Sequence, residues 1–185
     1  IMLLHIKGMV CHHCVEAVAA AATAAHLPGA QVRLGEADVP DAEITADKLS
    51  ALDEQLAMRG FKRITNPTDQ LIERTKLAIL QHVRDEGCRF NLSACLQDHL
   101  EVDYSTISKL FSAREGRTIE KYAIAQRVEY VKELLSYRQL NISEIADKTG
   151  YSSVAHLSRQ FKSVTGMTPS AFLKNCSARI PLNEV

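Results

Sequence analysis

The stretch GMVCHHC, residues 8–14, places two thiols three positions apart with two imidazoles between them. Thiolates are preferred ligands of soft metal ions, and side chains three apart at the start of a helix can converge on one ion. The unpaired amides and dipole of a helix N-terminus also favour the thiolate form of a cysteine there. Cys11 and Cys14 are therefore the candidate metal ligands, with Cu(I) favoured and Zn(II) or Hg(II) possible.

The two histidines between the thiols bear on which metal fits. A closed zinc site has four ligands, and the cysteine pair supplies only two. The residues between the cysteines of such a loop normally point to solvent, so we expect His12 and His13 to be exposed residues that tune access and charge. If one of them joined the cysteines, the site would shift toward Zn(II) or another borderline ion. Redox dithiols and halves of zinc sites have the same spacing, so spacing alone leaves those interpretations open.

The segments around the thiols predict the elements that must position them. MLLHIKG is typical of a buried strand, and the alanine-rich run after Cys14 predicts a helix. AQVRLGEADVP predicts a hairpin around Gly35, residues 45–60 predict a second helix, and FKRIT predicts a final strand. Residues 2–65 therefore predict an α+β ferredoxin-like βαββαβ domain, in which two helices cover one face of an antiparallel sheet.

Residues 68–178 carry a different pattern, a series of amphipathic helices separated by Gly, Pro, Asn or Asp. DYSTISKLFSAREGRT at 103–118 and SSVAHLSRQFKSVTGMT at 152–168 repeat one order of polar, apolar, basic and phenylalanine positions. A short helix and a tight turn precede each copy. The repeat predicts an all-α domain with two helix-turn-helix units, joined by a long helix at 118–136.

The first domain resembles a known metal-binding module. GMVCHHC between a strand and a helix is similar to the GMxCxxC loop of the heavy-metal-associated domain of copper chaperones and metal-pumping ATPases. The resemblance covers residues 2–65 and implies that Cys11 and Cys14 are ligands. It also implies that Met9 packs beneath the loop and that Phe61 leans toward the metal. The compact RLGEADV hairpin departs from the pattern and bears on the length of the middle strands.

The second domain, from about residue 70 to 174, resembles the DNA-binding domain of AraC/XylS-type transcription regulators. ISEIADKTGYSSVAHLSRQFKSVTGMTPSAF matches nearly all of the family's pattern. The resemblance implies that Ala146 lets two helices approach closely, that Gly150 takes a left-handed turn conformation and that Phe161 lies in the core.

The first helix-turn-helix unit departs from this pattern. Gln97 and Glu101 stand where the second unit has its small residue and its turn glycine. If the backbone is the same, a left-handed Glu101 strains the turn by about 1 kcal/mol.

In a helix-turn-helix unit, the exposed start of the second helix meets base edges in the major groove. The residues expected at the DNA are Tyr104, Ser105, Ser108 and Lys109 in unit one, and Ala155, His156, Ser158, Arg159 and Lys162 in unit two. Arg159 is the best candidate for a bidentate guanine contact, and Lys162 is expected at a phosphate. Two such helices can enter successive major-groove segments from one molecule, so either a monomer or a homodimer is expected.

Together the domains predict a metal-responsive transcription regulator that binds an ion through its CxxC loop and double-stranded promoter DNA through its tandem helix-turn-helix units. One alternative is a regulator whose N-terminal domain is a metal-independent docking or dimerisation module; another is a redox dithiol. No cofactor loop or substrate-pocket pattern favours an enzyme. The 22 basic and 22 acidic residues balance, and five cysteines with one close pair suit a reducing compartment. No apolar run approaches the roughly 20 residues that span a bilayer, so the expectation is a soluble, cytoplasmic protein without a membrane partner.

Overall fold

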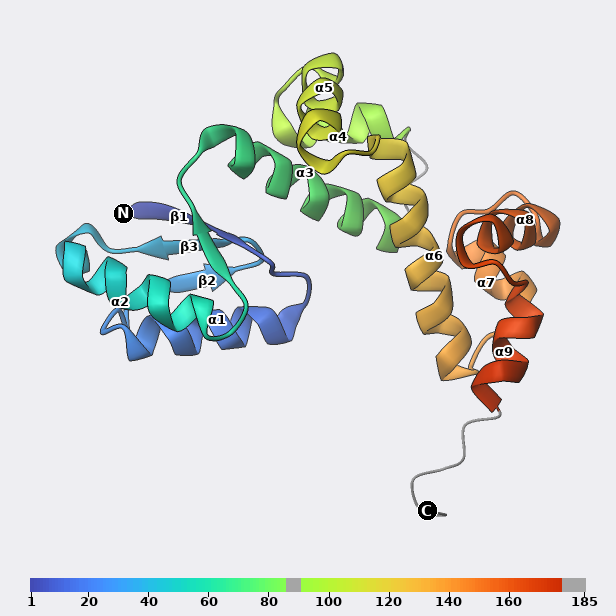
Figure 1. Ribbon diagram of the computed structural model, residues 1–185, viewed down its shortest axis with the longest axis horizontal. Helices are drawn as coiled ribbons and strands as arrows, with labels where there is room; N and C mark the ends of the chain where they lie inside the picture. Colours follow the sequence, from blue (N-terminus) through green and yellow to red (C-terminus); the bar gives the residue numbers. More distant parts are fainter. Residues whose placement is uncertain (86–90, 178–185) are drawn as a thin grey trace, which may run out of the picture. The chain divides into compact units, whose positions relative to one another are not determined.

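The computed structural model describes residues 1–85 and 91–177 of the chain (Figure 1). The first elements are β1 (Met2–Lys7), α1 (His12–Ala24), β2 (Gln31–Arg33), β3 (Glu36–Val39), the 3-10 helix η1 (Asp41–Glu43), α2 (Ala46–Ala57) and β4 (Lys62–Ile64). The helices that follow are α3 (Pro67–Arg84), α4 (Leu92–Leu100), α5 (Tyr104–Glu115), α6 (Ile119–Tyr137), α7 (Ile142–Lys148), α8 (Val154–Thr165) and α9 (Pro169–Ser177). None of the described helices is long and apolar enough to cross a membrane.

The chain divides into two compact units, one of residues 1–78 with 96–110 and the other of residues 79–95 with 111–185. In the first unit, four antiparallel strands form one sheet in the order β2-β3-β1-β4. Strand β1 is central and pairs with both β3 and β4. The elements follow one another in the order that the sequence predicts, and β2 and β4 have only three residues each.

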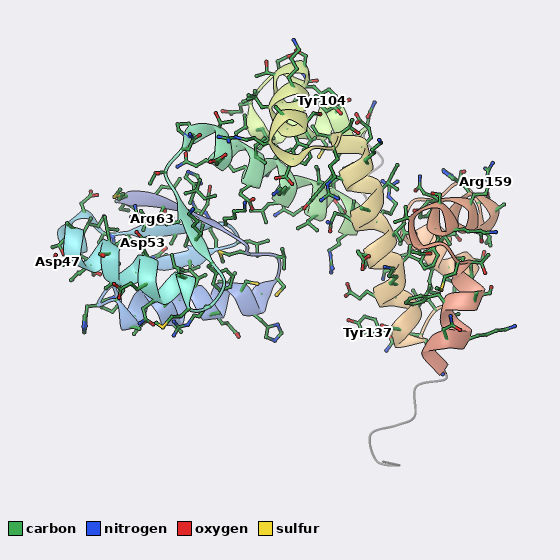
Figure 2. All side chains as sticks on the ribbon, viewed as in Figure 1. Asp47, Asp53, Arg63, Tyr104, Tyr137 and Arg159 are labelled. Carbon is green, nitrogen blue, oxygen red and sulfur yellow. The ribbon has the colours of Figure 1, made fainter. Side chains whose placement is uncertain are left out.

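Helices α1 and α2 cover one face of this sheet (Figure 1). Leu4 and Ile6 point from β1 into the shared core, because alternate side chains of a strand face opposite sides. Helix α1 faces them with small residues that allow close packing, and α2 adds Leu52 and Leu56. Figure 2 labels Asp53 of α2 and Arg63 of β4, whose two hydrogen bonds of 2.8 and 2.6 Å tie the helix to the edge strand.

The first part of helix α3 is attached to the same sheet at two points. The side-chain amide of Gln70 donates to the carbonyl of Ile64 at 3.0 Å. Leu77 lies against the turn between β2 and β3, at Gly35.

The buried stripe of α3 differs from the one that the sequence predicts. The spacing predicts Leu71, Leu77 and Leu80 toward a core, with Ile79 or Val83; the three leucines are only half-buried, whereas Ile79 and Val83 are buried. Ile72, Thr75 and Ala78 are also buried. Hydropathy misplaces the stripe because one of these buried residues, Thr75, is polar. Thr75 tolerates burial because its hydroxyl donates to a backbone carbonyl one turn earlier, at 2.8 Å. Gly87, the predicted end of this helix, lies outside the described residues.

The second unit has its core around α6. Val128, Val131 and Leu135 of that helix pack in one cluster with residues of α7 and α8. Asn141 begins α7 with a capping box, and Ser153 caps α8 by accepting a hydrogen bond from the amide of His156 at 3.1 Å. These caps fix where each helix of the second helix-turn-helix unit starts.

Candidate functional site

The two thiols lie together at the start of helix α1. Cys11 is the N-cap residue, with an extended backbone, and its carbonyl accepts a hydrogen bond from the amide of Cys14 at 3.0 Å. This turn brings the two sulfur atoms to 3.4 Å from each other. Cys11 is exposed and Cys14 half-buried, so one sulfur of the pair is open to solvent. The sequence therefore predicted correctly that this spacing makes the sulfurs converge.

The electrostatics of the loop favour the thiolate at Cys14. A backbone hydrogen bond from Val10 is the largest cause that lowers the pKa of Cys14, and hydrogen bonds from Cys11 act in the same direction. Partial burial opposes them, because desolvation favours the neutral thiol. Helix α1 has 13 residues and no acidic residue in its first turn. A thiolate is the form that ligates metals.

The histidines beside the thiols do not complete a larger ligand set in the described part of the chain. His12 is 82% exposed, and its Nε2 lies 3.6 Å from a carboxylate oxygen of Glu16. His13 is also exposed. Among the described residues, no group of three or more His, Cys, Asp or Glu side chains is arranged to hold a metal ion. Two thiols alone fit a soft ion such as Cu(I) or Ag(I) better than Zn(II), which requires four ligands.

Met9 and Phe61, two of the four residues expected to support the loop, are buried next to it. Met9 is 2% exposed, and its sulfur accepts a hydrogen bond from the amide of Gly35 at 3.3 Å. Phe61 is 9% exposed and lies beside Gly8. Gly8 has a φ of +99°, and a Cβ there would be 3.3 Å from the carbonyl oxygen of Gly60. The sulfur-to-amide hydrogen bond is the feature that the sequence does not reveal.

The second helix-turn-helix unit has the internal geometry that the sequence predicts. Ala146 is 1% exposed, Gly150 is left-handed with a φ of +73°, and Phe161 is buried. Tyr151, directly after the turn glycine, packs edge-on against the His156 ring with 5.2 Å between centroids. The turn and the start of α8 therefore form one packed element.

Helix α8 presents part of its predicted contact set to solvent. Ala155, Arg159 and Lys162 are exposed and recur at helical spacing, and Figure 2 labels Arg159 on the outer surface of this helix. His156 and Ser158 are half-buried. The Nδ1 atom of His156 lies 3.1 Å from the Ser152 hydroxyl, which orients the ring.

The first helix-turn-helix unit keeps the left-handed turn residue but shortens the turn. Glu101 has a φ of +54°, so a glutamate occupies the conformation that Gly150 has in the second unit. Only Val102 and Asp103 separate it from the start of α5, whereas three residues separate Gly150 from the start of α8. Gln97, at the position of the buried Ala146, is exposed. The expected strain at Glu101 therefore applies to this backbone.

Asp103 caps α5, a role that we did not assign from the sequence. Its carboxylate accepts hydrogen bonds from the Ser105 hydroxyl, from the Ser105 amide at 3.0 Å and from the Thr106 amide at 3.4 Å. These bonds, the Ser105 hydroxyl first, lower the pKa of Asp103. An aspartate immediately before an apolar helix pattern is an N-cap signal that could have identified it. Of the predicted contact residues on this helix, Ser105 and Lys109 are exposed, whereas Tyr104, labelled in Figure 2, and Ser108 are half-buried.

Comparison with known proteins concerns the helical part of the chain. A family model described as a helix-turn-helix domain matches residues 96–175. The arabinose operon regulatory protein of Escherichia coli is 28% identical over 131 residues, which cover 69% of this chain and 44% of that protein. The xylose operon regulatory protein of Haemophilus influenzae is 28% identical over 109 residues, 59% of this chain and 27% of that protein. The chain thus matches less than half the length of either relative.

Solved structures resemble the chain over a similar share. The C-terminal domain of AraT, a response regulator from Geobacillus stearothermophilus, matches with a TM-score of 0.53 and 21% identity, over 63% of this chain and 93% of that one. The DNA-binding domain of AdpA, solved in complex with a target DNA, matches with a TM-score of 0.52 and 22% identity, over 64% of this chain and 99% of that one. At these identities the likeness shows the fold. Residues 96–175 of this chain therefore match a helix-turn-helix domain, and the helical part has the fold of these solved domains.

Proposed function

We propose that this chain is a metal-responsive transcription regulator, in which Cys11 and Cys14 capture a soft ion and the helix-turn-helix units bind promoter DNA. One observation carries the proposal: a converging thiol pair at a helix N-terminus occurs in the same chain as a helix-turn-helix domain. The relatives named as arabinose and xylose operon regulatory proteins support a role in transcription. The βαββαβ order and the strand order support assignment of residues 2–65 to the ferredoxin-like, heavy-metal-associated class.

Of the second helices of the two helix-turn-helix units, α8 is better suited than α5 to recognise bases. Its exposed Arg159 has the planar guanidinium that pairs with both acceptors of a guanine, and Lys162 lies three positions on, at a place suited to a phosphate. The Ser153 cap and the Tyr151 contact fix the start of the helix, so these side chains project from a defined backbone. Replacement of Arg159 by Ala is expected to lower discrimination at one base pair by about 1–3 kcal/mol.

On the metal side, Cys14 supplies the thiolate and Cys11 the solvent-exposed sulfur. Cu(I) and Ag(I) suit two sulfur donors, and a bound ion of either kind supplies a positive charge and a bond to each sulfur. The Met9 and Phe61 side chains hold the loop from below, so the sulfurs are positioned by a packed core. Zn(II) or Hg(II) is a second choice for this donor set.

Regulation requires that ion capture favour one DNA-binding state over another. An ion with equal affinity for both states would shift nothing, whereas a typical allosteric coupling changes the affinity by about 5- to 150-fold. Because the coupling is reciprocal, DNA must change the affinity of the thiol pair by the same factor.

The test is a titration of Cu(I), Ag(I), Zn(II) and Hg(II) under anaerobic conditions while DNA binding is followed by fluorescence anisotropy. The DNA probe is a duplex that the wild-type chain selects from a randomised pool. In the wild type we expect the Kd for DNA to change by at least about fivefold with Cu(I). The matched Cys11→Ser/Cys14→Ser variant should keep its metal-free Kd throughout.

Equal DNA affinity in all of these conditions would refute metal sensing. If the purified chain also retained no metal at micromolar exposure, the N-terminal domain would instead be a metal-independent docking or dimerisation module on an AraC-type DNA-binding regulator. Reduced base discrimination in an Arg159→Ala variant would still support the DNA-binding part of the proposal in that case.

A further inference from the structure

The turn between β2 and β3 contacts both the thiol loop and helix α3. This turn consists of Leu34 and Gly35. The amide of Gly35 donates to the Met9 sulfur at 3.3 Å, and its carbonyl accepts from the amide of Ile6 at 2.8 Å. Both backbone polar groups of Gly35 are thus engaged by residues close to the thiols, since Ile6 and Met9 precede Cys11 by five and two positions.

The other side of Gly35 is closed by helix α3. Gly35 has a φ of +82°, and a Cβ built on it would lie 2.3 Å from the Cδ1 atom of Leu77. Leu77 is also the only described residue with an atom within 4 Å of that position, outside the chain neighbours. A side chain at residue 35 could therefore be accommodated only if the end of the Leu77 side chain, helix α3 or the turn moved.

Resting on the function proposed above, we infer that Met9, Gly35 and Leu77 form the contact series through which ion capture at the thiol loop acts on helix α3. Ligation restrains the backbone between Cys11 and Cys14, and Met9 lies two positions before that segment. A change in the position of Met9 acts on Gly35 through a buried hydrogen bond, and Gly35 has no side chain that could absorb the displacement. The displacement of Gly35 then moves Leu77, which lies against it.

Helix α3 extends beyond this contact to residues that hold α6. It is continuous from Pro67 to Arg84, and its last residue forms an ion pair with Glu133 of α6 at 2.8 Å. The Arg84 guanidinium also lies over the Tyr130 ring, 5.2 Å from its centroid. Helix α6 shares its core with α8. A shift of α3 therefore acts, through Arg84, on a helix that packs against α8. Each contact in this series lies within one of the two compact units, and α3, like α4 and α5, contributes residues to both.

Three variants test the inference. Leu77→Ala removes the side chain that faces Gly35, and Met9→Leu keeps the volume of residue 9 but removes the sulfur acceptor. Leu71→Ala is the matched control, since Leu71 is another half-buried leucine of α3 and has no atom near Gly35. Far-UV circular dichroism establishes that each variant is folded, and Met9→Leu carries the test if Leu77→Ala is not.

The first readout uses metal-free protein. Amide hydrogen exchange at Gly35 should be about fivefold faster in Met9→Leu than in the wild type, because its hydrogen-bond acceptor is gone. Unchanged exchange would show that this hydrogen bond does not hold the turn, and the inference would fall.

The second readout is the coupling factor, the ratio of the Kd for the selected duplex without and with Cu(I). We expect a wild-type factor that differs from 1 by at least about fivefold in either direction, a factor within about twofold of 1 in Leu77→Ala and in Met9→Leu, and the wild-type factor in Leu71→Ala. The Cu(I) affinity without DNA should stay within about threefold of wild type in Leu77→Ala and Leu71→Ala, because both substitutions lie on α3, away from the sulfur ligands and the Met9 support.

The outcomes separate the two proposals. A wild-type factor of 1 overturns the proposed function and this inference with it. A wild-type factor that persists in folded Leu77→Ala or in Met9→Leu, or that Leu71→Ala also abolishes, overturns this inference and leaves the proposed function standing.

Discussion

The left-handed glutamate in the first helix-turn-helix unit gives a prediction whose size follows from the structure. Glu101 is exposed and has a φ of +54°. A non-glycine residue in this conformation costs roughly 1–2 kcal/mol, because its Cβ crowds the following carbonyl oxygen. Glycine removes that strain but makes the unfolded chain more flexible, which offsets about 0.4–1 kcal/mol. Glu101→Gly is therefore expected to raise the free energy of unfolding by about 0.5–1 kcal/mol.

The assay is urea unfolding at pH 7 followed by circular dichroism, with thermal unfolding as a second measure. The expected rise in Tm is about 1–4 °C for a chain of this size. Glu101→Ala is the matched control, since it removes the carboxylate but keeps a Cβ, and it should change stability by less than about 0.5 kcal/mol.

Gly150 supplies the reverse control. It has a φ of +73°, and no atom lies within 4 Å of a Cβ built there, so Gly150→Ala introduces backbone strain without a clash. That variant should lose about 0.5–1 kcal/mol. If Glu101→Gly is no more stable than the wild type, or if Glu101→Ala gains as much, strain at this turn is not what limits the first unit.

Three further predictions concern caps and the thiol pair. Asn141→Ala should destabilise the chain by about 1 kcal/mol in urea unfolding, because the Asn141 side chain accepts from two amides at 2.9 and 3.0 Å, and Asn141→Ser should recover most of the loss. The lowered pKa of Asp103 means that its stabilisation is present above the unfolded pKa of about 3.9 and is lost as pH falls through the lower folded value. Asp103→Asn should therefore unfold with a weaker dependence on pH in this acidic range, and an unchanged acid profile would contradict the assigned hydrogen bonds. The third prediction concerns Cys14, whose pKa is lowered mainly by the hydrogen bond from Val10. In a Cys11→Ser variant, mass spectrometry should show that Cys14 begins to be alkylated at a lower pH than a cysteine in a short unstructured peptide.

Periodicity and turn residues predict most of the architecture because those features are local. Leu4 and Ile6 face the core at strand spacing, Thr45 caps α2 by accepting from the Lys48 amide, and Gly150 has the left-handed conformation that its position in the repeat predicts. Each of these follows from a residue and its near neighbours in sequence. The converging thiols belong to the same class, since the turn at a helix start sets the distance between positions i and i+3.

The features that escaped prediction depend on partners far away in sequence or on a polar residue inside an apolar stripe. The hydrogen bond from Gly35 to the Met9 sulfur joins residues 26 positions apart, and no local pattern indicates it. Thr75 lies fully buried in α3 because of its backbone hydrogen bond, whereas hydropathy alone favours the neighbouring leucines. Tyr151 has a buried hydroxyl without a partner among the described residues, and burial raises its pKa; its position between the turn and α8 depends on tertiary packing.

The two helix-turn-helix units differ in how firmly their helices are set, and the difference bears on their roles. The second unit combines a turn glycine, the buried Ala146 and a capped start of α8, all of which favour one geometry. The first unit has a strained Glu101, a shorter turn and an exposed Gln97 in place of the small buried residue. Base reading requires side chains held on a well-defined backbone, whereas phosphate contacts tolerate more variation because they depend mainly on charge. The structure of the chain therefore favours α8 as the helix that reads sequence and α5 as the helix that contacts mainly phosphate, so Arg159→Ala should alter which duplex is selected, whereas Lys109→Ala should weaken binding to all duplexes alike.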